Sequence, residues 1–134
     1  MKLVSFYRKN LTPGIGVAGL EPDRILDLNA LDPHVPQNIN AFLAGGDETL
    51  AMAKRLVDKR GSNKAAMLAG SQYTLRPSVP APSKFLLMGI NYKAHVIETG
   101  RQVPDKPVIF GRWAQCLIAS GDAIRVDDLP PRQR

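Results

Sequence analysis

The sequence contains a single cysteine, Cys116, and no long hydrophobic run. One thiol cannot form an intramolecular disulfide and has no companion cysteines for a metal site, so nothing here requires an oxidising compartment. The longest apolar run, Phe85–Ile90, is far shorter than the roughly 20 residues that cross a bilayer as a helix. The first residues, Met1–Arg8, lack the apolar core of a signal peptide. We therefore expect a cytoplasmic protein with no membrane partner.

Several common catalytic signatures are also missing. The sequence has no P-loop, GxSxG or HExxH pattern, which removes the usual phosphate, hydrolase and zinc-protease motifs. Its carboxylates are not clustered with metal-ligand spacing, so the chain alone predicts no metal ligands. The adjacent Asp127 and Asp128 would point to opposite sides of an extended strand and could not act as an acid/base pair.

Aromatic residues make up only 6% of the chain, although its formal net charge is +6. Nucleic-acid binding requires concentrated basic charge, and single-strand binding also uses aromatic rings for base stacking. The 18 basic residues are spread from Lys2 to Arg134, and no aromatic residue is interleaved with their one modest cluster. That cluster consists of Lys54, Arg55, Lys59, Arg60 and Lys64. We expect a solvated helix face there and no nucleic-acid partner.

What is present is the composition of a soluble globular protein, with 44% hydrophobic and 22% charged residues. A length of 134 residues suits one ordinary domain, or a small domain followed by an incomplete second one. Length alone does not distinguish these two arrangements.

The first thirty residues predict a small β-meander. The segments Lys2–Tyr7, Ile15–Ala18 and Arg24–Leu28 are rich in strand formers and are separated by turn residues. No residue in this region is a candidate for catalysis.

Two helices are expected next. Ile39–Ala44 favours a short helix that ends at the two glycines Gly45 and Gly46. Glu48–Arg60 has apolar residues at helical spacing, with Asp47 as the expected N-cap and basic residues toward its end.

Prolines then mark a domain boundary. Pro77, Pro80 and Pro82 disfavour helix and a central strand, so residues 74–83 are interpreted as an extended linker. This divides the chain into a small N-terminal domain at 1–73 and a second region at 84–134. The elements expected after the linker are a buried strand at Phe85–Met88, a short helix at Asn91–Glu98, a loop at Gly100–Lys106 and a strand at Pro107–Phe110.

The pair His95 and Glu98 is the strongest chemical candidate. Residues three apart on a helix share a face, so the imidazole and the carboxylate can project into the same space. A carboxylate can hold the ring in one tautomer, and the pair can then position and deprotonate a water molecule. Asn91 can cap the turn or present its amide to a substrate oxygen. Taken alone, this spacing is common and more often means a modest surface pair than a catalytic one.

Two other reactive side chains have plainer interpretations. His34 lies in a proline-bounded loop with no evident partner and is treated as a loop residue. Cys116 lies in an apolar run, where a buried structural thiol is a better interpretation than a nucleophile.

Three linked blocks after Pro82 carry a resemblance to a known family. They run from Lys84 to Glu98, from Val103 to Phe110 and from Ala119 to Ile124. They closely resemble the start of the catalytic domain of the fumarylacetoacetate hydrolase family, whose members show Gly-x-Asn-Tyr-x-x-His-x-x-Glu, Pro-Val-x-Phe and Gly-Asp-x-Ile at similar spacing. The preceding domain resembles the N-terminal domain of many bacterial members.

The resemblance implies a site and a chemistry. In the family a divalent cation, commonly Mg²⁺, Mn²⁺ or Ca²⁺, chelates a 2-oxo acid or a 1,3-dicarbonyl compound. By similarity His95 would be the base and Glu98 its partner, while Asn91, Tyr92 and Arg112 would contact substrate. Arg112 stands where the family usually has a lysine followed by proline, so the contacts there differ in geometry. The segment from Tyr92 to Asp105 would close over substrate, and a homodimer is expected.

The family's metal-binding Glu-x-Glu and a later aspartate would follow Arg134, which implies that this chain is C-terminally truncated. A hard cation needs several carboxylate ligands, so the fragment is expected to bind it poorly and to be inactive.

The expected fold is α+β: a small N-terminal α/β domain, then the first part of a mixed β-rich catalytic domain. The expected function is metal-dependent hydrolysis, decarboxylation or isomerisation of a small 2-oxo acid in catabolism. The alternative is a non-catalytic binding or interaction module of the same lineage.

Overall fold

The computed structural model describes residues 1–125 of the 134. These residues form two compact units, and each is described by itself. The first consists of Met1–Pro80 together with the stretch that begins at Ile118, and the second of Ala81–Leu117.

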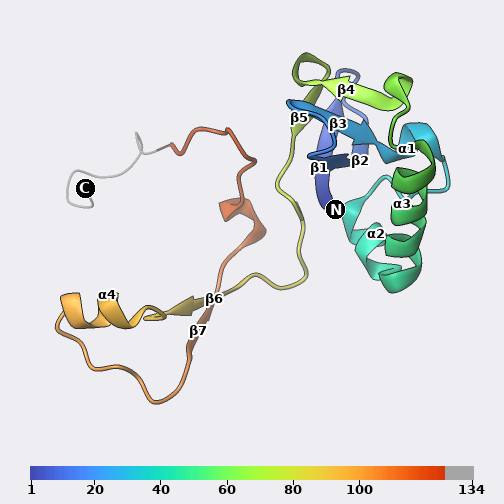
Figure 1. Cartoon of the computed structure of the whole chain (residues 1–134). Helices are drawn as coiled ribbons and strands as arrows, with labels where there is room; N and C mark the ends of the chain where they lie inside the picture. The colour runs from blue at the N-terminus through green and yellow to red at the C-terminus, as the bar shows by residue number, and fades with distance from the viewer. Residues whose placement is uncertain (126–134) are drawn as a thin grey trace. The chain divides into compact units, whose positions relative to one another are not determined.

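The first unit is built on a five-stranded antiparallel sheet (Figure 1). Its strand order is β4-β3-β2-β1-β5, so the first three strands are neighbours and the predicted meander is confirmed. The strands are β1 (Lys2–Arg8), β2 (Pro13–Ala18), β3 (Arg24–Asp27), β4 (Met67–Ala69) and β5 (Tyr73–Leu75).

Strand β5 closes one edge of this sheet. It pairs antiparallel with β1, with Thr74 opposite Tyr7, and the amide of Arg76 then donates to the carbonyl of Ser5 at 2.8 Å. The segment interpreted as a linker therefore begins with two residues that are paired in the sheet. Pro77 follows directly, and a proline cannot continue a hydrogen-bonded ladder.

Three helices pack together on one side of the sheet (Figure 1). They are α1 (Leu28–Leu31), α2 (Ile39–Ala44) and α3 (Gly46–Arg60), and the 3-10 turns η1 (Lys64–Ala66) and η2 (Gly70–Gln72) flank β4. The expected N-cap role of Asp47 is wrong, because α3 starts earlier and Gly45 is its cap. Gly46 has φ of +56°, which lets the chain reverse directly from α2 into α3 and places Asp47 inside the first turn.

The core lies between the sheet and these helices. Ile15 and Leu26 from the strands are fully buried, as is Phe42 from α2, and Ala53 is the buried contact of α3. Leu50, Met52, Leu56 and Val57 pack against this cluster while partly exposed. The amphipathic pattern predicted for α3 is thereby confirmed.

A partly buried ion pair joins two strands of the sheet. Arg8 at the end of β1 donates from Nε and Nη2 to the two carboxylate oxygens of Asp27, both at 2.7 Å. Strand β2 lies between these two strands, and the guanidinium passes over Gly14. A Cβ at Gly14 would lie 2.9 Å from Nη2 of Arg8 and 2.7 Å from Cζ of Phe6. Asp27 also caps α1 by accepting from the amide of Ala30.

The second unit contains a two-stranded antiparallel sheet and one short helix. Its elements are β6 (Leu86–Gly89), α4 (Lys93–Glu98), β7 (Val108–Gly111) and the 3-10 turn η3 (Ala114–Cys116). The bounds of β6, α4 and β7 lie within two residues of the sequence predictions, whereas η3 was not predicted. The order of strand, helix and strand is therefore confirmed.

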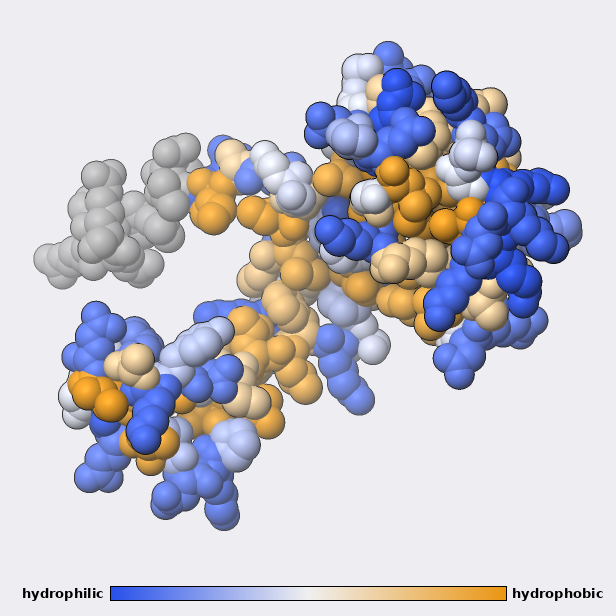
Figure 2. Space-filling model, viewed as in Figure 1, coloured by the Kyte–Doolittle hydropathy of each residue, from blue (hydrophilic) through white to orange (hydrophobic). Residues whose placement is uncertain are grey.

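Hydrophobic side chains reach the surface of this second unit (Figure 2). The expected burial of the first strand is wrong, since Leu86 is 63% exposed, and Ile109 on the paired strand is 62% exposed. Cys116 is also exposed rather than buried. The reason is the same in each case: apolar composition predicts burial only if another layer covers the residues, and two strands with one six-residue helix supply little cover.

The described residues thus have a mixed α+β fold with antiparallel sheets. Among them no helix has the length and apolarity that a membrane span requires.

Candidate functional site

His95 and Glu98 lie on one face of α4. Nδ1 of His95 is 3.6 Å from Oε2 of Glu98, at the spacing of three residues that the sequence predicted. The distance fits an ion pair but is longer than a hydrogen bond. Both side chains are largely exposed, at 65% and 80%, so water screens their interaction in this unit.

Local interactions fix the end of this helix. The hydroxyl of Thr99 donates back to the carbonyls of His95 and Val96, at 2.9 and 3.1 Å. Gly100 then takes a φ of +67°, and the amide of Arg101 donates to the carbonyl of Val96. This is the usual glycine-terminated helix end. It sets where α4 stops, directly after Glu98.

The start of the helix is less regular. Tyr92 is the N-cap and makes no side-chain capping bond, so of the two roles considered for Asn91, the capping role is excluded. Before it, Ile90 has a φ of +52°. A β-branched residue in this left-handed region is strained, and such strain persists only where surrounding structure holds it. The strained residue lies between β6 and the helix that carries the pair.

Asn91 lines a groove of about 300 Å³, whereas Tyr92 is exposed and does not line it. The groove runs between the end of β6 and the loop that leads to β7. Its remaining lining residues are Met88, Gly89, Ile90, Val103, Pro104, Asp105, Lys106, Pro107 and Val108.

Arg112 follows β7 and lies on a different element from the pair. Its amide donates to the carbonyl of Phe85 at 2.9 Å, which extends the two-stranded ladder by one bond. Its guanidinium carbon lies 5.3 Å from the centre of the Phe110 ring. In the described part of the chain, no hydrogen bond or ion pair joins Arg112 to the other predicted site residues. Its role in substrate contact stays a prediction.

The described residues do not by themselves fit a divalent cation. Within residues 1–125, no three histidine, cysteine, aspartate or glutamate side chains converge into a set that could hold a metal ion. We therefore derive no step through a metal from this chain. Asp127 and Asp128 lie outside the described residues.

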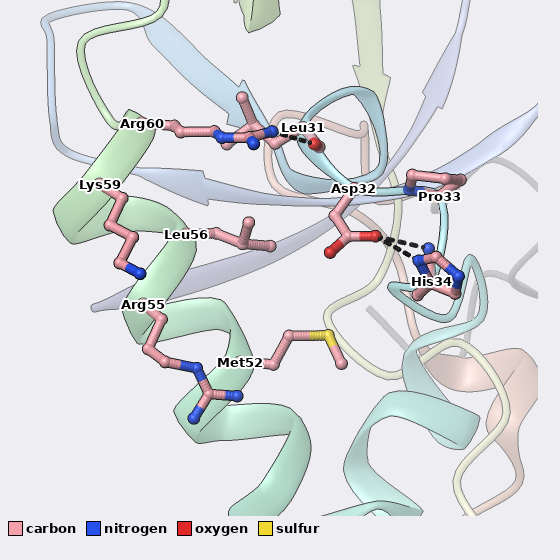
Figure 3. A pocket seen from close by; sticks show the side chains of 9 residues that line it. All are labelled: Leu31, Asp32, Pro33, His34, Met52, Arg55, Leu56, Lys59 and Arg60. Carbon is pink, nitrogen blue, oxygen red and sulfur yellow. Dashed lines mark hydrogen bonds and ion pairs between the residues drawn. The ribbon is translucent and has the colours of Figure 1, made fainter.

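A second polar cluster, which the sequence analysis missed, lies in the first unit. His34 was expected to have no partner, but its Nδ1 lies 2.8 Å from Oδ1 of Asp32, and its amide donates to the same oxygen (Figure 3). These hydrogen bonds, the backbone one first, lower the pKa of Asp32 below its ordinary value, with help from the charges of His34 and Arg60. The sequence did contain a signal for this contact: an aspartate in a loop often accepts a hydrogen bond from the backbone amide two residues further on, which here is that of His34.

Comparison with known proteins gives the lineage. No family model matches the chain. It is 33% identical over 129 residues to the mitochondrial oxaloacetate tautomerase fahd2 of Xenopus laevis, covering 96% of this chain and 39% of that protein. The human mitochondrial oxaloacetate tautomerase FAHD2A is 30% identical over 135 residues, covering 100% of this chain and 41% of that protein.

A protein of Pongo abelii, named fumarylacetoacetate hydrolase domain-containing protein 2, matches to the same extent as the human one. The chain therefore spans about two fifths of the length of these relatives. The similarity extends over both units and includes the segment with the His95 and Glu98 pair. The chain belongs to the fumarylacetoacetate hydrolase family.

Proposed function

We propose that this chain holds the N-terminal domain and the start of the catalytic domain of an enzyme that acts on a small 2-oxo acid. For the complete protein we keep the predicted division into residues 1–73, a linker at 74–83 and a catalytic region from 84 onward, with the first two residues of the linker paired to β1. In the complete protein, the exposed ladder of β6 and β7 would form the first layer of a larger β-rich domain.

The observation that carries this proposal is the placement of His95 and Glu98 on one helix face, 3.6 Å apart. Because Nδ1 faces the carboxylate, a proton on Nδ1 would be held there and Nε2 would be free to act as the base. His95 would then remove a proton from a carbon next to the substrate carbonyl, or from a water molecule. Glu98 would orient the ring and stabilise it once it is protonated.

Asn91, Tyr92 and Arg112 are proposed to contact the substrate. Asn91 borders the groove after β6, where its amide can donate to a carbonyl or carboxylate oxygen. Arg112 supplies a permanent positive charge for a carboxylate, and a guanidinium can bind it through two nitrogens. The strained Ile90 supports this assignment, because such backbone strain is found mostly where a site demands one geometry.

A divalent cation, Mg²⁺, Mn²⁺ or Ca²⁺, is part of the proposal for the complete enzyme. When bound, such a cation polarises carbonyl and carboxylate oxygens and stabilises an enolate. Its ligands would come from the family's carboxylates outside the described residues. The 134-residue chain is therefore proposed to be inactive by itself.

The names of two relatives suggest the reaction to test first. Both are called oxaloacetate tautomerases, and tautomerisation takes a proton from a carbon beside a carbonyl and adds a proton to the carbonyl oxygen, which a base and its protonated form can do. Hydrolysis or decarboxylation of a related 2-oxo acid would use the same base. We therefore propose the substrate class and leave these three reactions as the outcomes that an assay distinguishes.

The test compares this chain alone with a fusion in which the C-terminal three fifths of the Xenopus laevis relative follow it. Keto–enol exchange of oxaloacetate is followed by its ultraviolet absorbance, with and without Mg²⁺ or Mn²⁺. We expect no turnover by the chain alone and cation-dependent turnover by the fusion. His95→Ala in the fusion should lower the rate by about 10²- to 10⁴-fold, the usual contribution of a general base.

His34→Ala is the matched control, since it removes the other histidine from a different unit. It should leave the rate of the fusion unchanged. An unchanged rate in His95→Ala would show that the assigned base is wrong. Turnover by the chain alone would overturn the proposal that it lacks an essential part.

One observation favours the alternative, a non-catalytic interaction module. Leu86, Ile109 and Trp113 are exposed in the second unit, and exposed apolar surface often marks a protein partner. Sequencing the coding DNA past codon 134 distinguishes the two: a family-like Asp-Tyr-Glu-x-Glu continuation supports the enzyme, and a stop codon supports the module.

We also propose that the complete protein forms a homodimer and lies in the cytoplasm. The names of the Xenopus laevis and human relatives place those proteins in mitochondria, so the location of this protein has to be tested separately. Sedimentation of the fusion and fluorescence imaging of the tagged protein test these two points.

A further inference from the structure

A groove of about 510 Å³ lies in the first unit, between α3 and the loop that joins α1 to α2 (Figure 3). One side is formed by the last two turns of α3 and the other by the segment from Leu31 to His34. Apolar side chains, including Met52 and Leu56 of α3, line its floor. The complete lining is Leu31, Asp32, Pro33, His34, Met52, Arg55, Leu56, Lys59 and Arg60.

The helix side of the groove carries three cations. Arg55, Lys59 and Arg60 face one carboxylate, that of Asp32, so the lining has a formal charge of +3 − 1 = +2 with His34 neutral. Within residues 1–125, neither Arg55 nor Lys59 has an ion pair with a protein carboxylate. In the described part of the chain, the charges of Arg55 and Lys59 therefore have no carboxylate partner, whereas Arg60 lies near Asp32.

The helix alone does not explain this arrangement. Basic residues in the last turn, Lys59 and Arg60, complement the helix dipole. Arg55 lies a turn earlier, and its i,i+4 partner on the same face is Lys59. Like charges at this spacing destabilise a helix by about 0.2–0.5 kcal/mol. An anion bound between them would turn that repulsion into attraction.

Two features give the groove a defined shape. Nη1 of Arg60 donates to the carbonyl of Leu31 at 2.9 Å, which holds the guanidinium across the top of the groove and leaves its other N–H groups available. On the opposite side, the two hydrogen bonds from His34 hold the carboxylate of Asp32. The acid is thus engaged within its own loop.

We propose that this groove binds a small anion that carries at least two negative charges on phosphate or carboxylate oxygens. Arg55 and Lys59 would contact one end of the ligand and Arg60 the other, while Met52 and Leu56 would lie under its short apolar part. Guanidinium groups bind both kinds of oxyanion, so phosphate and carboxylate share this chemistry. The lining contains no Phe, Tyr or Trp ring for base stacking, which disfavours a nucleic acid.

The site is independent of the proposed catalytic function. All its lining residues belong to the first unit, whereas His95 and Glu98 belong to the second. Binding can therefore be measured on the 134-residue chain, whether or not that chain has any activity.

The experiment is calorimetric titration of the whole chain with pyrophosphate and, separately, with succinate, at constant ionic strength. Sodium chloride is the blank. We expect saturable binding of one equivalent of at least one of the two, and the comparison identifies phosphate or carboxylate as the preferred group. Arg55→Gln and Lys59→Gln should each weaken binding about tenfold, because each removes a charged hydrogen-bond donor.

Lys54→Gln is the matched control. It removes the same charge from the same helix, but Lys54 lies beside Asp58 in a different groove. It should change the affinity less than twofold, and circular dichroism should show all three variants folded. Absence of saturable binding by both anions, or an equal loss in Lys54→Gln, would overturn the proposal. Tight binding of an oligonucleotide with a steep salt dependence and no binding of either small anion would overturn it as well.

Discussion

Arg8 of β1 and Asp27 of β3 form an ion pair through two contacts, and strand β2 lies between the two strands that carry them. Both contacts are 2.7 Å long, and the Asp27 side chain is only 3% exposed. The pair joins β1 to the start of α1, because Asp27 is also the cap of that helix. It therefore connects the sheet to the helical layer at one point.

Breaking this pair should destabilise the first unit strongly. Arg8→Met leaves a buried carboxylate with no cation, and loss of one partner of a buried pair typically costs about 3–5 kcal/mol. Urea unfolding followed by circular dichroism measures the change. Arg24→Met is the matched control, because Arg24 and Glu21 form an exposed pair at 3.6 Å, whose loss should cost about 0–1 kcal/mol. Equal effects in the two variants would mean that the buried pair contributes no more than a surface one.

A methyl group at position 14 should also destabilise the first unit. Gly14→Ala places a Cβ within 3 Å of both the Phe6 ring and the Arg8 guanidinium, and overpacking of this kind costs about 1–3 kcal/mol. The control is Gly70→Ala, where nothing lies within 4 Å of the added atom. Differential scanning calorimetry should show a lower Tm for the first variant and a nearly unchanged one for the second. A harmless Gly14→Ala would contradict the close approach.

Relief of backbone strain provides a test in the second unit. Ile90→Asn should stabilise the start of α4, because asparagine tolerates positive φ and the left-handed region costs an ordinary residue about 1–2 kcal/mol. Slower amide hydrogen exchange at residues 93–98 is the expected result. Ile109→Asn serves as the control, since it puts the same residue into a strand, where asparagine is disfavoured and should weaken β7. Faster exchange in Ile90→Asn would show that the isoleucine side chain matters more than its backbone.

The lowered pKa of Asp32 predicts a pH dependence of stability. A carboxylate whose pKa is lower in the folded state adds stability above its unfolded pKa of about 4 and loses it as pH falls through the folded value. Asp32→Asn should therefore be less stable than the parent chain above about pH 4, and the difference should shrink as the solution becomes more acidic. Urea midpoints measured across this range show it. His34→Gln removes the side-chain hydrogen bond and the charge of His34 but keeps the backbone hydrogen bond, so its effect should be smaller than that of Asp32→Asn. A difference that grows with acidity would give the opposite sign and contradict the assignment.

Much of the fold follows from local sequence signals. The meander and helix α3 were predicted because alternation, helical spacing and turn residues act over a few neighbouring positions. Strand β4 and helix α1 were missed, since segments of three or four residues are fixed by their partners in the sheet and core rather than by their own pattern. The Arg8 and Asp27 pair was missed for the same reason, because its members lie 19 positions apart along the chain.

Some features of the candidate site could likewise be predicted from the sequence, and others could not. The shared face of His95 and Glu98 follows from helix geometry alone, and the structure places them so. The left-handed backbone at Ile90 could not be predicted, because glycine at position 89 or asparagine at position 91 would adopt it at lower cost. The exposure of Leu86 and Cys116 was missed for a different reason: composition reports what a side chain prefers, and burial depends on which other layers are there to cover it.

The pairing of β5 with β1 has a consequence for how such a chain can be rearranged. The first strand of the N-terminal sheet and the last one are neighbours, so the polypeptide enters and leaves this unit along the same edge. A segment whose two ends lie together can be spliced into another gene, duplicated or replaced without pulling its own sheet apart. Residues 2–75, which hold every strand of this sheet, meet that condition, so a replacement of this segment can keep all of the sheet's strand pairings together.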